Sequence, residues 1–348
     1  MPNKKKTRQE KTRFSSKHII LIPIIISLIT ALSFTIYFLF SQSEAKFSLN
    51  AAIIDQLKIE YQNQAFIDNV TSLLEKYGFQ VTYYKTARVD VYRELAKKDY
   101  GIIILRVHSA LREDKSTVDL FTSERYSPYD PDKYRWEREN DYMVIGELLY
   151  RPGQFYYAVT HKFIQNLEGR FSKSIIVAMG CWSLKEGCEQ LAKAFVDKGA
   201  IAYIGWTNIV LINHTDTETM KLLTMLLDQN YSVSKAVSKT QNYSYIDAKT
   251  GEKIETKMRF YPAREDIANL KISDLIAETK TTLNSNFLLN YLPYDILLLA
   301  TFPSKYHFWN HKNDIFLKYS ICCTSNSYIK CCSIKINLSS YIELNYRR

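Results

Sequence analysis

The chain has 348 residues, of which 46% are hydrophobic and 24% charged, a composition that excludes a disordered protein and allows one large globular domain or two small ones. The formal net charge is +10, but residues 1–17 contain seven lysines and arginines and one glutamate. This tail is therefore +6, and the other 331 residues together are only about +4. The distribution removes the main argument for a nucleic-acid partner, and we expect none.

A membrane anchor is predicted directly after the basic tail. Ile19 to Phe40 is an uncharged run of 22 residues, which as a helix spans the roughly 30 Å of a bilayer core. The lysines and arginines before it should stay in the cytoplasm. A cleaved signal peptide is the alternative, but signal cores are only about 7 to 15 residues long. We therefore expect a single-pass cell-membrane protein with a cytoplasmic tail (1–18), a transmembrane helix (19–41) and an extracytoplasmic main domain.

After the anchor, short apolar runs alternate with amphipathic stretches, which is typical of a parallel sheet with crossover helices. Between Gln62 and Tyr77 apolar residues recur at helical spacing, and Gly78 follows as a C-terminal cap. Tyr100 to Val107 contains the run Ile-Ile-Ile-Leu, which indicates a strand buried on both faces. The first elements are expected to be strands at 51–57, 79–84 and 100–107 and helices at 62–77 and 89–98.

Polar alternation between Ser109 and Pro152 predicts an insertion into this pattern. It is expected to form a β-hairpin from strands at 117–123 and 144–150, with a long loop between them. The alternation of short apolar runs with amphipathic stretches then resumes. We expect helices at 157–167, 187–198, 215–228 and 233–242 and strands at 173–179 and 200–206.

The C-terminal part has no steady hydrophobic period beyond Ala277. Phe287 to Leu299 resembles a second hydrophobic helix, but Pro293 and Asp295 argue against a membrane span. We predict one folded domain over residues 47–277, with its insertion at 109–152, and an irregular segment over 278–348. A mispredicted terminus is the alternative for that segment.

Neither a metal nor a cofactor is expected. Adjacent cysteine pairs near the C-terminus differ from the C-x2-4-C spacing of zinc sites, and His161, His214 and Asp216 also lack ligand spacing. No P-loop or GxGxxG string is present. The six cysteines are Cys181, Cys188, Cys322, Cys323, Cys331 and Cys332.

Two reactive side chains follow neighbouring predicted strands. His108 closes the third core strand and Cys181 closes the fourth. Ligands and catalytic groups collect at the C-terminal ends of parallel strands, which lie about 4.8 Å apart. The imidazole and the thiol can therefore face each other, as nucleophilic catalysis by a cysteine requires. The alternative is a structural histidine and a buried, inert cysteine.

The backbone around these residues suits the same chemistry. Gly180 gives the chain room to turn before the cysteine, and the amides of Ser109 and Cys181 are candidates for stabilising an oxyanion. Substrate preference stays open, because the insertion and its surroundings hold charges of both signs. The acidic candidates are Asp119, Glu124, Asp130, Asp132 and Asp141, and the basic ones are Arg106, Arg112, Arg125 and Arg138.

The stretch from Lys173 to Trp206 carries a family-like pattern. A hydrophobic strand ends at Cys181, a helix follows, and the next strand opens at Gly199-Ala200 and ends at Gly205-Trp206. The helix carries Leu191, Ala192, Ala194 and Phe195. This stretch is similar to the corresponding segment of caspase-like (clan CD) cysteine peptidases, especially the CHAT and gingipain-like branches.

The strand before His108 resembles the histidine strand of that family, and the resemblance covers roughly Ala51 to Lys239. It implies a caspase-like three-layer α/β/α fold with a mostly parallel sheet, with His108 as general base and Cys181 as nucleophile. A peptide or protein substrate and no cofactor are implied as well. The family usually has glycine after the histidine, whereas this chain has Ser109, which bears on the approach of a substrate carbonyl and on the oxyanion donor.

A catalytically inactive binding module on the same scaffold, which presents the insertion to a partner, is the alternative function. The two functions differ in the expected state of the thiol. Pairing with histidine lowers a thiol pKa, so an active site should alkylate quickly, whereas a silent module should hold a sluggish thiol.

Overall fold

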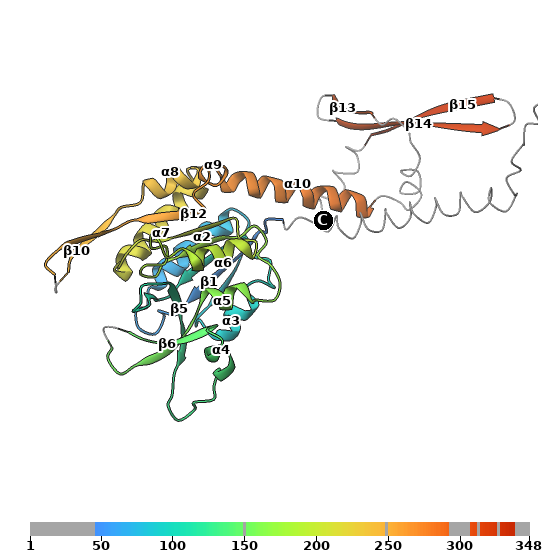
Figure 1. The fold of residues 1–348 in the computed structure, drawn as a ribbon. Helices are drawn as coiled ribbons and strands as arrows, with labels where there is room; N and C mark the ends of the chain where they lie inside the picture. Colours follow the sequence, from blue (N-terminus) through green and yellow to red (C-terminus); the bar gives the residue numbers. More distant parts are fainter. Residues whose placement is uncertain are drawn as a thin grey trace, which may run out of the picture. The chain divides into compact units, whose positions relative to one another are not determined.

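The computed structural model describes residues 46–148, 151–247 and 250–291, together with strands at 307–311, 314–325 and 328–337 (Figure 1). The chain divides into two compact units, residues 1–280 and 281–348. The predicted tail and the predicted anchor from Ile19 to Phe40 lie outside the described residues. No helix within the described ranges is both long enough and apolar enough to cross a bilayer.

A six-stranded, mostly parallel sheet forms the centre of the first unit, which confirms the predicted α/β class. Its strand order is β12-β9-β8-β3-β1-β2. The pairs from β9 to β2 are parallel, and β12 at one edge is antiparallel to β9. The strands are β1 (Asn50–Asp55), β2 (Gln80–Tyr84), β3 (Ile102–Arg106), β8 (Ile175–Ala178), β9 (Ala202–Trp206) and β12 (Met258–Tyr261).

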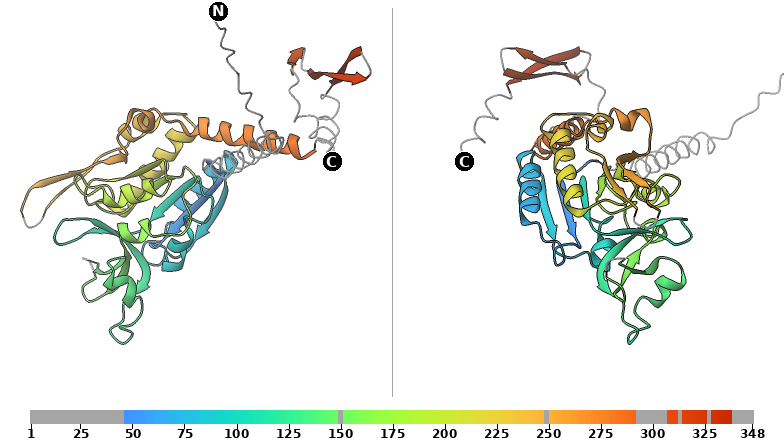
Figure 2. Two further views of the ribbon diagram at one scale, coloured as in Figure 1. Left: turned by 45° about the vertical axis from the view of Figure 1, so that its right-hand side comes forward. Right: turned by 90° about the vertical axis from the view of Figure 1, so that its left-hand side faces the viewer.

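Helices cover both faces of this sheet (Figure 2). The side chains of β3 alternate between two hydrophobic clusters: Ile102 and Ile104 belong to one, Ile103 and Leu105 to the other. This alternation is why the Ile-Ile-Ile-Leu run is apolar throughout. One face carries α2 (Gln64–Lys76), α7 (Ile212–Leu227) and α8 (Val233–Ser238), and the other carries α3 (Val89–Glu94), α5 (His161–Gln165) and α6 (Gln190–Asp197).

Helix α2 illustrates how local sequence sets these elements. The side chain of Asn63 caps its first turn by accepting a hydrogen bond from the Phe66 amide at 3.1 Å. The apolar face predicted from the sequence is buried, and the helix ends before Gly78, whose φ is +92°. A positive φ favours glycine, so the predicted C-terminal cap is confirmed.

The insertion is larger than the predicted hairpin. It forms a four-stranded antiparallel sheet of order β4-β5-β7-β6, with the short helix α4 (Arg135–Glu139) between β5 and β6. Figures 1 and 2 show this part of the chain, in teal and green, extending away from the main sheet. Its strands are β4 (Ser109–Leu111), β5 (Val118–Arg125), β6 (Met143–Glu147) and β7 (Phe155–Val159).

The helix predicted at 157–167 was wrong in its first part. Phe155–Val159 is strand β7, and the helix begins only at His161 after Thr160 caps it. Alternate residues of the strand enter different clusters, Tyr156 on one side and Tyr157 on the other. Because β7 pairs with both β5 and β6, two ladders of hydrogen bonds outweigh the weak helical spacing of this aromatic run.

Helix α8 begins at Val233, where a helix was expected, but it ends at Ser238. The elements that follow it in the first unit were not predicted. A two-stranded ribbon, β10 (Tyr243–Ile246) and β11 (Lys253–Thr256), precedes β12, and α9 (Glu265–Ala268) and the start of α10 (Ile272–Tyr291) follow. In the second unit, β13 (His307–His311), β14 (Asp314–Ser325) and β15 (Tyr328–Asn337) form an antiparallel sheet. The predicted hydrophobic helix at 287–299 lies outside the described residues beyond Tyr291.

Candidate active site

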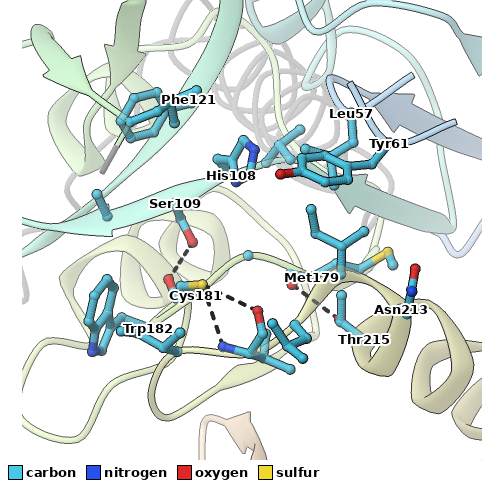
Figure 3. A pocket seen from close by; sticks show the side chains of 18 of the residues that line it. Leu57, Tyr61, His108, Ser109, Phe121, Met179, Cys181, Trp182, Asn213 and Thr215 are labelled. Carbon is cyan, nitrogen blue, oxygen red and sulfur yellow. Dashed lines mark hydrogen bonds between the residues drawn. The ribbon is translucent and has the colours of Figure 1, made fainter. Parts of the chain in front are cut away.

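His108 and Cys181 line the same cavity, which has a volume of about 520 Å³ (Figure 3). The strands that carry them, β3 and β8, are parallel neighbours with Leu105 opposite Ala178. The chain runs two residues beyond β3 to His108 and three beyond β8 to Cys181. Figure 3 shows the imidazole and the thiol on facing sides of the cavity. The juxtaposition expected from the strand ends is therefore present.

The loop that follows β1 contacts both the backbone and the imidazole of His108. The His108 amide donates a hydrogen bond of 2.7 Å to Gln56 Oε1, and the Tyr61 ring stands nearly perpendicular to the imidazole at 6.4 Å. Nε2 of His108 lies 3.8 Å from a carboxylate oxygen of Glu60. Glu60 also meets Arg151 at 3.3 Å and the hydroxyl of Tyr156 at 3.3 Å.

Burial lowers the pKa of His108 to about 4, because the apolar surroundings disfavour the imidazolium. The carboxylate of Glu60 opposes this effect, and Arg106 and Arg151 add to it. The side chain is only 15% exposed. At neutral pH the imidazole is therefore uncharged and able to accept a proton.

The thiol of Cys181 sits against the loop after β9. It donates a hydrogen bond of 3.6 Å to the Val210 carbonyl, and the Val210 amide donates to Sγ at 3.5 Å. Burial raises the pKa of the thiol, and hydrogen bonds from the backbone amides of Val210 and Cys181 only partly offset this. The pKa of the resting thiol is therefore not lowered, as the active-site alternative would require, but raised. The pair rests as a neutral thiol and a neutral imidazole.

The turns that carry the two side chains pack tightly against each other. A Cβ added to Gly180 would lie 2.7 Å from both the Ser109 nitrogen and the Val107 oxygen, so only glycine fits there. Ser109 Oγ donates a hydrogen bond of 2.5 Å to the Cys181 carbonyl. Trp182 holds a left-handed conformation with φ of +55°, which is uncommon for a bulky residue. Ser109 therefore ties the histidine turn to the cysteine turn.

A network of buried ion pairs lies next to the site. Arg106 is fully buried and bonds Asp55 at 2.8 Å and Asp216 at 2.9 Å through two nitrogens. It also donates to the Tyr61 carbonyl at 2.8 Å, and Asn63 donates to Asp216 at 2.9 Å. Arg106 thus joins β1, β3 and α7 to the loop beside His108, and it is not a contact for an acidic substrate side chain as the sequence had allowed.

Several charged residues of the insertion that were considered for substrate preference already form ion pairs. Arg112 bonds Asp119 at 2.7 Å and Asp141 at 3.0 Å, and Glu124 bonds Lys133 at 2.7 Å. None of these five side chains is among the residues that line the cavity.

The residues considered for a metal do not come together. Asp216 is occupied by Arg106, the Nε2 of His214 is 2.9 Å from the Gln241 carbonyl, and His161 lies near Thr117. Within the described ranges no group of three or more His, Cys, Asp or Glu side chains could hold a metal ion.

Sequence reasoning missed Glu60 and the loop that carries it. Asp55 at the end of β1 gave one usable signal, because a carboxylate at the C-terminal end of a core strand lies at the edge where sites form. Nothing in the spacing indicated that Glu60 would reach a histidine in another strand.

The chain matches no model of a known protein family, and no curated protein matches it.

Proposed function

We propose that this chain is a membrane-anchored, caspase-like cysteine peptidase that cleaves peptide bonds with Cys181 and His108. The observation that carries the proposal is that a thiol and a neutral imidazole, which follow neighbouring parallel strands, line one cavity. The mostly parallel sheet with helices on both faces is consistent with the fold that the sequence resemblance implies.

The neutral resting pair suggests how the chemistry begins. As Sγ of Cys181 attacks the carbonyl carbon of the substrate, His108 accepts the thiol proton, and the carbonyl oxygen takes the negative charge. The amides of Ser109 and Cys181 are the proposed donors to that oxygen. The carbon–nitrogen bond then breaks, and His108 gives its proton to the leaving amine. Water, deprotonated by His108, finally hydrolyses the thioester and restores the thiol.

Glu60 assists this sequence of proton transfers. Its carboxylate faces Nε2 of His108 and favours the charged form of the imidazole. The imidazolium forms only during the reaction, so this attraction acts mainly in the transition state, where it lowers the barrier.

Cleavage of a fluorogenic peptide library by the full-length chain in mild detergent tests the proposal. We expect cleavage by the native chain and its loss in Cys181→Ala and in His108→Ala. Cys188→Ala is the matched control, because Cys188 lies outside the residues that line the cavity. Cleavage that persists in Cys181→Ala would show that another residue is the nucleophile.

A catalytically inactive binding module is the second candidate. The raised thiol pKa and the hydrogen bonds that hold Sγ to Val210 favour it, since both make the resting thiol a poor nucleophile. In that case the four-stranded insertion sheet is the surface offered to a partner. A protein that binds peptides equally well with and without Cys181, and cleaves none, would support the module over the peptidase.

We also propose a single-pass placement in the cell membrane, with the tail in the cytoplasm and the domain outside. The support is the uncharged run from Ile19 to Phe40 behind its basic tail. Fusion of a reporter that is active only outside the cytoplasm, placed after residue 280, tests the orientation. The mass of the mature chain separates an anchor from a cleaved signal peptide.

A further inference from the structure

The cavity around Cys181 and His108 has mainly apolar walls. Of the described residues that line it, only His108 and Glu147 carry an imidazole or carboxylate side chain. Glu147 is exposed, and its carboxylate accepts a hydrogen bond of 2.5 Å from the Gly153 amide. Most of the remaining lining is aliphatic or aromatic.

The apolar residues gather on two sides of the reacting pair. Figure 3 shows Leu57, Tyr61 and Met179 on one side of the line from His108 to Cys181, and Phe121 and Trp182 on the other. Leu57 and Met179 are almost fully buried, whereas Tyr61 is 40% exposed. We call the first group the apolar side pocket, defined by Leu57, Tyr61 and Met179.

Several polar groups near the side pocket already have partners. The Thr215 hydroxyl donates to the Met179 carbonyl at 3.1 Å, and Arg106 behind the wall is paired with two aspartates. Glu60 is engaged with His108 and Arg151. A charged substrate side chain in this pocket would lose its water without gaining a counter-ion, which is costly.

We propose that the substrate residue on the acyl side of the cleaved bond is a large apolar one, such as leucine, methionine or phenylalanine, and that it occupies the apolar side pocket. This inference rests on the proposed peptidase function and adds its substrate class. Burial of such a side chain is expected to favour it over a charged one by about 10- to 100-fold in affinity.

Peptide aldehydes test this inference without requiring turnover. The thiol adds across the aldehyde: the sulfur–carbon bond forms, and the thiol proton ends on the oxygen as a hemithioacetal. A set of aldehydes that differ only in the terminal side chain, Leu, Met, Phe, Lys, Arg, Asp or Glu, is titrated into the full-length chain. Carbon-13 NMR of the labelled aldehyde carbon gives each dissociation constant, with Cys181→Ala as control.

We expect hemithioacetals that are lost in Cys181→Ala, with the three apolar aldehydes bound at least tenfold more tightly than the four charged ones. Equal affinities, or a preference for a charged aldehyde, would overturn the substrate class while leaving the proposed function in place. If no aldehyde forms a hemithioacetal at Cys181, the proposed function and the substrate class fail together.

A matched pair of variants tests where the side chain binds. Tyr61 is half exposed, so Tyr61→Asp and Tyr61→Leu should both fold. We expect the affinity ratio of the lysine aldehyde to the leucine aldehyde to rise at least tenfold in Tyr61→Asp, and to stay within threefold in Tyr61→Leu. A general loss of reactivity cancels in the ratio. An unchanged ratio in Tyr61→Asp would refute the assignment of the side pocket.

Discussion

The buried imidazole of His108 should make the domain less stable in mild acid. In the unfolded chain its pKa is the ordinary 6.5, and in the folded chain burial lowers it to about 4. Between pH 6.5 and pH 4, His108 is therefore protonated in the unfolded chain and neutral in the folded chain. The contribution of this residue to stability is complete above pH 6.5 and is lost as the pH falls toward 4.

The size of the loss follows from the two pKa values. Each pH unit between them changes the free energy of unfolding by about 1.4 kcal/mol, so the full window is worth roughly 3 kcal/mol. The side chain is 15% exposed, so solvent screening reduces this only slightly. His108→Gln removes the titrating group and keeps a polar side chain, and the variant should lack this part of the pH dependence.

Urea unfolding, followed by tryptophan fluorescence at pH 7.0, 6.0, 5.0 and 4.5, measures the effect in the native chain and in His108→Gln. The difference in free energy of unfolding between the native chain and His108→Gln should change by about 2 to 3 kcal/mol in favour of the variant as the pH falls. Burial also lowers the pKa of His161, but that residue is present in both proteins and cancels. A difference that stays constant within about 0.5 kcal/mol would refute the argument from burial.

Arg106→Met should lower the free energy of unfolding by about 3 to 5 kcal/mol, because it leaves two buried carboxylates without their cation. Lys76→Met, which removes an exposed ion pair, should change it little in the same urea titration, and equal effects would contradict the structural role of the buried network. Gly180→Ala should both destabilise the domain by about 1 to 3 kcal/mol and reduce Cys181-dependent cleavage, because the new methyl group meets the backbone of Ser109 and Val107. Unfolding titrations and peptide cleavage measure this, and native behaviour in both would show that the two turns are not packed as described.

The strands and helices were predictable where the hydrophobic period was strong. The four consecutive aliphatic residues of β3 and the apolar face of α2 leave little choice of element. The edge strand β12 was missed, because four residues are too few to set a period. Strand β7 was partly mistaken for a helix, because its aromatic residues satisfy either spacing and only pairing with two neighbours decides between them.

The candidate site was predictable in its main residues and not in its electrostatics. His108 and Cys181 follow core strands, and strand ends converge on one edge of a parallel sheet. Arg106 was considered as a substrate contact, because a buried arginine and an exposed one look alike until their partners are known. A lowered thiol pKa was expected for an active pair and a sluggish thiol for an inactive one, and the sequence could not decide between them, because it does not show how deeply the thiol is buried.

The role of His108 as a base for Cys181 is tested most directly by the rate at which p-nitrophenyl acetate acetylates Cys181. Mass spectrometry of the peptide that contains this residue gives the rate between pH 5.5 and 8 in the native chain and in His108→Ala. We expect a nearly flat profile in the native chain, since the imidazole is already neutral at pH 5.5, and a loss of about 100-fold or more in the variant. A rate that rises tenfold per pH unit and is unchanged in His108→Ala would contradict the account, because the thiolate alone would then be reacting.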